Sequence, residues 1–307
     1  MEHPTKHQRS IFARIFISPD EPRLRAGWRL LIQTILMVVI AMGFSIPLLL
    51  LSEAFQFAID GLILNQIIEL FVITVSVYLA RRFLDRRTFV SLGLKLDRRA
   101  AFDVLAGIVI TGLMMGLIYI IEWGAGWLSF ESFAWQVQPV ENVLSGVVLM
   151  LVIFIFVGWN EELLSRGYHL QTLTSGINLT WGVVLSSAVF GVLHLGNPNA
   201  TWVSTAGIFF AGVFLAYGYI RTRQLWLSIG LHIGWNFFEG VVFGFPVSGL
   251  SDIPRLILHT VDGPELITGG AFGPEAGLVM LPALIAGALA IWWYAGGRPV
   301  EQESVDQ

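Results

Sequence analysis

Long apolar segments recur along nearly the whole chain. A helix needs roughly 20 apolar residues to cross the hydrocarbon core of a bilayer, and eight segments come close to that length. They are residues 27–51, 57–80, 102–123, 143–160, 177–195, 201–220, 225–245 and 276–295. The pattern predicts an all-α, polytopic membrane protein with about eight transmembrane helices.

The first apolar segment does not have the features of a cleaved signal peptide. Its apolar part is too long for a signal sequence, a polar stretch of about 25 residues precedes it, and no small-x-small cleavage site follows it. We therefore expect it to be the first span.

Basic residues gather in four of the segments that flank the apolar runs. If the spans alternate, these four segments lie on one side, and Lys and Arg are retained on the cytoplasmic side. The pattern therefore predicts that both termini are cytoplasmic, with Arg255 alone on the outer side and Arg166 near the inner end of the fourth run. The sixteen basic residues of the four segments are Lys6, Arg9, Arg14, Arg23, Arg25, Arg29, Arg81, Arg82, Arg86, Arg87, Lys95, Arg98, Arg99, Arg221, Arg223 and Arg298.

Composition supports membrane residence and narrows the chemistry. Charged residues make up 13% of the chain, against about 25% in soluble domains. The absence of cysteine excludes disulfides, a thiolate nucleophile and zinc sites built on sulfur. The net charge of −4 gives no indication of a nucleic-acid partner. Any reaction must therefore use oxygen and nitrogen groups.

The chain reads as one membrane domain between two tails. We expect cytoplasmic tails at residues 1–25 and 298–307, a single transmembrane helical domain at 26–297, and a motif-bearing core at about 143–245. The expected location is the bacterial plasma membrane, with the lipid bilayer as a partner.

Polar residues inside the apolar runs are functional candidates, because ionisable groups are costly in a bilayer. The second run carries Asp60, Asn65, Gln66 and Glu69. For these we favour hydrogen bonding between helices over a catalytic role.

A denser polar group lies at residues 158–169, which we expect to be helical and continuous with the fourth run. On a helix, Glu162 and Arg166 are four residues apart and share a face, whereas Glu161 and Arg166 point about 140° apart. Glu162 can therefore pair with the guanidinium, which leaves Glu161 available as a general base. The alternative is an ordinary salt-bridge cluster that ends the span, and the segment alone does not decide between the two.

Two histidines lie in separate apolar runs. Phe190 and His194 share one helical face, and His232 and Asn236 share another, each pair being four residues apart. A single such histidine is usually structural, but two of them in a chain with six histidines favour a common site.

Together these residues can hydrolyse an amide without a side-chain nucleophile. A carboxylate and an imidazole can deprotonate water, while an imidazole and a carboxamide can donate to an oxyanion. Glu161, His194 and His232 would equally suit a zinc ion with an open position for water, so both chemistries remain open.

Three motifs, EExxxR at 161–166, FxxxH at 190–194 and HxxxN at 232–236, stand in this order along the chain. At these residues the sequence resembles the CPBP family of intramembrane endopeptidases, which includes CAAX proteases and bacteriocin-processing enzymes. The resemblance covers roughly residues 143–245. It implies an eight-helix protease that cleaves peptide bonds near the membrane surface.

The resemblance also implies roles for these residues. Glu161 and His194 would activate water, His232 and Asn236 would stabilise the oxyanion, and Glu162, Arg166 and Phe190 would support the site. We favour this metal-free mechanism, with no cofactor, because Asn236 is a good oxyanion donor and a poor metal ligand. Zinc held by Glu161, His194 and His232 is the alternative.

The resemblance leaves the substrate and two other functions open. The implied substrate is a membrane protein or a lipidated or leader-bearing peptide. An ion-coupled transporter would use Asp60, Glu69, Glu161 and Glu162 as a proton relay. A non-catalytic immunity or scaffold protein would keep only the fold.

One expectation conflicts with the others. Strict alternation places Glu161 and His232 toward the inner half of the membrane but His194 at the far end of its span, roughly 25 Å away. Either the fifth span starts below the bilayer or its expected boundary near Ile177 is wrong by a turn or more.

Overall fold

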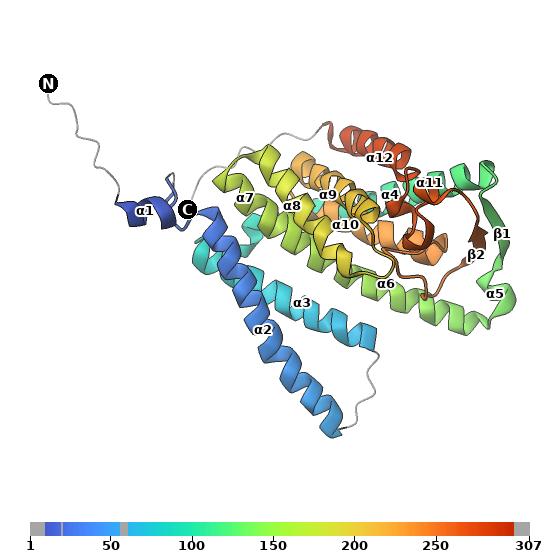
Figure 1. The fold of residues 1–307 in the computed structure, drawn as a ribbon, viewed down its shortest axis with the longest axis horizontal. Coiled ribbons are helices and arrows are strands. Elements are labelled where there is room, and N and C mark those ends of the chain that lie inside the picture. Colours follow the sequence, from blue (N-terminus) through green and yellow to red (C-terminus); the bar gives the residue numbers. More distant parts are fainter. Residues whose placement is uncertain (1–9, 20, 56–60, 298–307) are drawn as a thin grey trace.

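The computed structural model describes residues 10–19, 21–55 and 61–297 of the chain (Figure 1). Most of this part is helical, as the apolar runs predicted. The α-helices are α1 Ile11–Phe16, α2 Ala26–Phe55, α3 Gly61–Leu79, α4 Arg98–Gly124, α5 Ala134–Val137, α6 Val140–Glu162, α7 Gln171–Gly176, α8 Leu179–Leu193, α9 Trp202–Thr222, α10 Leu225–Asn236, α11 Glu265–Thr268 and α12 Met280–Ala295.

Shorter elements extend or connect these helices. The π-helical segments are η1 Ala80–Leu84, η3 Leu163–Leu170 and η5 Phe237–Val242, and the 3₁₀ segments are η2 Phe89–Leu92, η4 His194–Gly196, η6 Gly270–Phe272 and η7 Pro274–Ala276. The two strands found in the described part of the chain are β1 Leu128–Phe133 and β2 Ile257–Val261.

Each of the eight apolar runs coincides with a helix, so the prediction of an all-α polytopic membrane protein is confirmed. Within the described ranges, six helices are long and apolar enough to cross a membrane on their own. The other two runs correspond to α10, continued by η5, and to α12, which has 16 residues. Exposed apolar side chains such as Leu113 and Leu289 suit a surface that faces lipid.

The fourth helix is much longer than its apolar run. From Val140 the helix passes through η3 and α7 to Gly176, over 37 residues. The sequence predicts that residues 158–169 continue this helix, and they do; the polar residues after position 160 face the protein interior. Glu162, Ser165 and Arg166 are all buried.

The described parts of three basic segments meet at one end of the molecule, which we call the basic end; Arg298 lies outside the described residues. The buried carboxylate of Asp85 pairs with Arg29 from α2 and, at 3.1 Å, with Arg81 from η1. Arg29 also donates to Ser175 Oγ at the end of α7, at 2.7 Å. In the same way, Trp226 Nε1 donates to the backbone oxygen of Lys95 at 2.9 Å. Three of the four segments expected on one side of the membrane are therefore neighbours in space.

The opposite end carries a small antiparallel ribbon, and we call it the ribbon end. β1 pairs with β2 from Leu128 opposite Val261 to Phe133 opposite Ile257, with a bulge between Phe130 and Ser132. Figure 1 shows β1, β2 and α5 at the end of the molecule away from α1 and α7. α6 runs from the ribbon end toward the basic end.

A glycine seam joins α10 to α4. A Cβ on Gly107 would overlap the backbone of Leu231, and one on Gly230 would overlap that of Val104. A Cβ on Gly234 would meet Thr111 Oγ1. Small residues let two helices approach closely within a membrane. The seam therefore fixes the position of α10, the helix that carries His232 and Asn236.

Candidate active site

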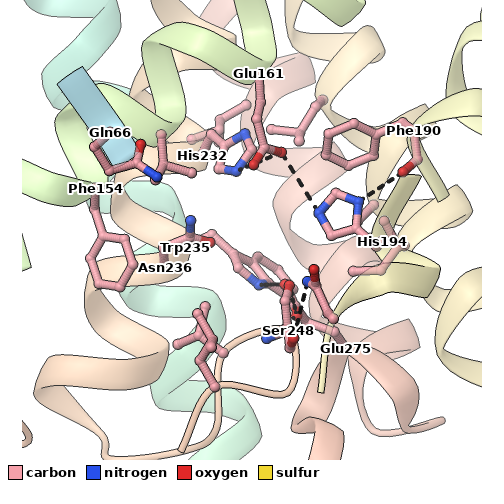
Figure 2. Close-up of a pocket in the computed structure, with 18 of the residues that line it drawn as sticks. Gln66, Phe154, Glu161, Phe190, His194, His232, Trp235, Asn236, Ser248 and Glu275 are labelled. Atoms are coloured by element: carbon pink, nitrogen blue, oxygen red, sulfur yellow. Dashed lines mark hydrogen bonds and ion pairs between the residues drawn. The ribbon is translucent and has the colours of Figure 1, made fainter. Parts of the chain in front are cut away.

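A cavity of about 290 Å³ lies among the central helices (Figure 2). Its walls come from α3, α6, α8 with η4, α9, α10 and the connection between η5 and α12. The residues of the cavity on which the following description depends are Asn65, Gln66, Glu69, Val157, Glu161, Phe190, His194, His232, Trp235, Asn236, Val247, Ser248, Leu250 and Glu275.

Glu161, His194 and His232 converge at this cavity from three different helices. Glu161 Oε2 lies 3.7 Å from His194 Nε2 and 3.8 Å from His232 Nε2. The Glu161 side chain is 33% exposed, whereas those of His194 and His232 are 15% and 7% exposed. Three residues predicted for one site therefore lie within reach of a common point.

The second nitrogen of His194 is held by the backbone. His194 Nδ1 lies 2.8 Å from the carbonyl oxygen of Phe190, one turn earlier in the helix. Because a carbonyl oxygen only accepts, Nδ1 must carry the proton of this hydrogen bond. In the neutral ring, Nε2 is then an acceptor, and it is the nitrogen that faces Glu161.

Glu162 lies behind the cavity in a buried network. Its Oε1 accepts from Arg166 Nη1 at 2.7 Å and is 2.8 Å from His232 Nδ1. Arg166 in turn donates to the backbone oxygen of Gly212 at 3.1 Å. The predicted pairing of Glu162 with Arg166 is present, and the adjacent carboxylate of Glu161 points elsewhere. The two glutamates therefore occupy different environments.

Phe190 lies between the charged network and the histidines. Its ring centroid is 4.2 Å from the Arg166 guanidinium carbon and 4.7 Å from the His194 ring. It also makes an edge contact with His232 at 6.1 Å. The aromatic of the second motif thus contacts members of all three motifs.

Asn236 lines the same cavity one helical turn after His232, and its side chain is buried (Figure 2). The seam of α10 against α4 fixes both residues on one rigid helix. An imidazole and a carboxamide are thereby presented together on one wall.

The conflict over the depth of His194 is resolved by the long fourth helix. Glu161 does not end this helix, since fifteen residues follow it before the helix ends at Gly176. α8 then returns over a similar length, from Leu179 to Leu193, and brings His194 back to the level of Glu161. α8 begins close to the expected residue, Ile177, so the structure agrees with the first alternative, a fifth helix that starts below the level of Glu161.

Three residues of the cavity were not anticipated from the sequence. Glu275 Oε1 accepts from Trp235 Nε1 at 3.0 Å, and Glu275 Oε2 accepts from the backbone nitrogen and hydroxyl of Ser248 at 2.8 and 2.6 Å. Burial raises the pKa of Glu275, and the Ser248 hydrogen bonds oppose that shift. The only signal in the sequence was the glycine- and proline-rich connection that contains Ser248 and leads to Glu275.

The polar residues of α3 also line the cavity. Asn65 Nδ2 donates to Glu69 Oε1 at 2.9 Å, and Gln66 Nε2 donates to Glu69 Oε2 at 3.2 Å. These hydrogen bonds lie within one helix, so the expectation of hydrogen bonds between helices was wrong for this group. Asp60 lies outside the described residues.

Glu161, His194 and His232 are residue types that bind zinc, but their arrangement differs from that of a zinc site. Zinc ligands converge on one point at about 2.0–2.2 Å. No group of three or more His, Cys, Asp or Glu side chains in the described part of the chain is disposed in that way. We therefore derive no step through a metal.

Comparison with known proteins agrees with the three motifs. Residues 142–238 match a family model described as "Type II CAAX prenyl endopeptidase Rce1-like". The chain is also 26% identical over 169 residues to a Bacillus subtilis (strain 168) protein named "Putative membrane peptidase YdiL". That alignment covers 55% of this chain and 64% of the relative, which is less than two thirds of its length.

Proposed function

We propose, from the Rce1-like character of residues 142–238, that this chain is an intramembrane endopeptidase that hydrolyses peptide bonds with a glutamate-activated water. The observation that carries the proposal is the convergence of Glu161, His194 and His232 from three helices on one cavity. The match to a membrane peptidase supports the same reaction class.

Glu161 and His194 are the groups that activate water in this proposal. Separations of 3.7 and 3.8 Å are longer than direct hydrogen bonds. A water against Glu161 Oε2 would be in reach of both imidazoles. The carboxylate accepts the water proton as hydroxide attacks the scissile carbonyl, and His194 Nε2 is placed to relay that proton to the leaving amine.

His232 and Asn236 are the donors to the oxyanion that forms on the scissile carbonyl. If His232 donates from Nε2 to the oxyanion and from Nδ1 to Glu162, its ring carries both protons. The Glu162 carboxylate compensates that charge, and Arg166 keeps the carboxylate in place. Two such donors, fixed before the reaction, stabilise the transition state in a site that excludes bulk water.

The setting of the reaction is part of the proposal. We propose a single membrane domain at residues 26–297 in a bacterial plasma membrane, with cytoplasmic termini. Of the predicted tails at 1–25 and 298–307, residues 1–9, 20 and 298–307 lie outside the described residues. The proposed substrate is a membrane protein or a lipidated or leader-bearing peptide.

A fragment comparison tests the proposal. Membranes containing the wild-type protein are compared with membranes containing Glu161→Ala, and the matched control is Glu141→Ala, an exposed acid on the same helix. We expect at least one protein to accumulate uncleaved with Glu161→Ala but not with Glu141→Ala. Identical fragment patterns in all three membranes would overturn the proposal.

Single substitutions then assign the roles. His194→Ala and His232→Ala should each abolish cleavage of the identified substrate, with membrane insertion unchanged. Full activity in either variant would remove that histidine from the mechanism. Loss of activity on chelation, restored by zinc alone, would favour the zinc alternative over the metal-free one.

A further inference from the structure

Along α6, α3 and α10 the cavity extends from the reactive residues toward the ribbon end. On α6 the other lining residues, Phe154 and Val157, precede Glu161 and so lie on its ribbon-end side. On α3 the lining residues lie between Leu62 and Glu69, in the half of the helix away from Arg81. On α10, whose start is tied to Lys95 at the basic end, they lie in the second half.

The basic-end side of the reactive residues is filled. Leu163, Tyr168, Leu225 and Leu227 are 0% exposed, and Arg166 is 2% exposed. None of the residues of η1, η3 or α7 lines the cavity. Close packing there leaves no path for a peptide from the basic end.

The remaining wall comes from the connection at the ribbon end. Val247, Ser248 and Leu250 face the cavity. Ser248 is held by Glu275 Oε2, which accepts from its backbone nitrogen, and by Asn197 Nδ2, which donates to its backbone oxygen at 3.1 Å. This connection continues into β2 of the ribbon. The cavity and the ribbon therefore share one end of the molecule.

The charge of the lining restricts what can enter. The lining includes three acids, Glu69, Glu161 and Glu275, and no Lys or Arg among the described residues that form it. An anionic chain terminus would therefore meet these carboxylates with no Lys or Arg in the lining to pair with it, and its entry is disfavoured. A neutral or basic internal segment fits better.

We propose that peptide reaches the reactive residues from the ribbon end, which the distribution of basic residues assigns to the outer side of the membrane. The substrate class is then a membrane-anchored chain, cleaved at an internal bond of a neutral or basic segment that faces outward. This rests on the proposed endopeptidase function. It differs from cleavage at a cytoplasmic chain terminus.

The absence of cysteine makes access directly measurable. Single cysteines are placed at Val157, one helical turn before Glu161 in the cavity wall, and at Asn65 on α3. Ser129→Cys in β1 and Lys95→Cys mark the ribbon end and the basic end, since both positions are exposed. Intact cells and inverted vesicles are treated with a small, membrane-impermeant cationic methanethiosulfonate, and modification is followed by loss of later maleimide labelling.

In intact cells we expect Val157→Cys, Asn65→Cys and Ser129→Cys to be modified and Lys95→Cys to be protected. We also expect the cationic reagent to react faster than its anionic counterpart at Val157→Cys, by about tenfold or more relative to Ser129→Cys. Val157→Cys and Asn65→Cys modified only in inverted vesicles would overturn the proposal. Protection of Val157→Cys and Asn65→Cys in both intact cells and inverted vesicles would also overturn it. So would modification of Lys95→Cys in intact cells, or the same ratio of cationic to anionic reagent rates at every position.

These readouts need no substrate and no activity. Outward access without any cleavage would therefore contradict the endopeptidase function and leave the entry route standing. Cleavage that depends on Glu161, together with access from the inner side only, would support the endopeptidase function and contradict the entry route.

Discussion

Glu162 and His232 are joined by a 2.8 Å hydrogen bond between Oε1 and Nδ1, on the side of the imidazole that faces away from the cavity. The same carboxylate oxygen pairs with Arg166. His232 is thereby fixed by a residue that does not itself line the cavity.

Replacing Glu162 by Gln should reduce activity more than substrate binding. The imidazole loses the carboxylate that compensates its charge, so kcat should fall by about 10²–10³-fold, the range for loss of one oxyanion donor. KM should change little. Steady-state kinetics on the identified substrate measure both, with Glu141→Gln on the exposed face of α6 as control. Unchanged kcat would show that His232 does not depend on this bond.

Phe190→Leu should weaken the site through the arginine beneath it. The substitution removes a ring 4.2 Å from the Arg166 guanidinium, a contact worth about 2 kcal/mol when desolvated. We expect a lower thermal transition in detergent and reduced kcat, because His194 loses a packing partner. Phe210→Leu, at an exposed position on α9, is the matched control. Equal effects of the two substitutions would contradict this role.

Gly230→Ala should disturb the helix that carries His232. The added methyl overlaps the backbone of Val104, and overpacking of this kind costs about 1–3 kcal/mol or more. Gly43→Ala on α2 has no atom within 4 Å of the new methyl and gains helix propensity of about 1 kcal/mol. The thermal transition temperature and the activity should therefore fall for Gly230→Ala. For Gly43→Ala they should rise or stay unchanged. Wild-type behaviour of Gly230→Ala would argue against a tight seam.

The ribbon should be sensitive to acid through His259. Burial lowers the pKa of this imidazole to about 4, below its ordinary value near 6.5. Between these two values the unfolded chain binds a proton that the folded chain excludes, so stability is complete above pH 6.5 and falls as the pH drops toward 4. His259→Phe keeps the ring contacts with Phe245 and Tyr119 and does not titrate. The transition temperature of this variant should fall less between pH 7 and pH 4.5. If the transition temperatures of the wild type and of His259→Phe fell equally between pH 7 and pH 4.5, His259 would be excluded as the cause of the acid sensitivity.

The sequence predicted the helices and the three motifs because each depends on local spacing. Apolar length marks every span, and residues four apart share a helical face, as for His232 and Asn236. The depth of the site was not predictable in the same way. The sequence predicts that the helix continues through residues 158–169, but only the structure shows that it extends to Gly176 and that its polar residues are buried against neighbouring helices.

Residues from distant parts of the chain were also missed. Glu275 reaches the cavity through hydrogen bonds to Ser248 and Trp235 that no local pattern encodes. The hydrogen bonds of Glu69 were assigned to other helices, although partners four and three residues away satisfy it within α3.

The glycine seam limits how this chain can change in evolution. Where Gly107, Gly230 and Gly234 bring backbone against backbone, no layer of side chains separates α10 from α4, so no substitution there can shift α10 gradually. The cavity walls from α3 and from residues 247–250 carry side chains that can vary in size and polarity. New substrate preferences should therefore arise in those walls, while the spacing of the reacting groups is inherited unchanged.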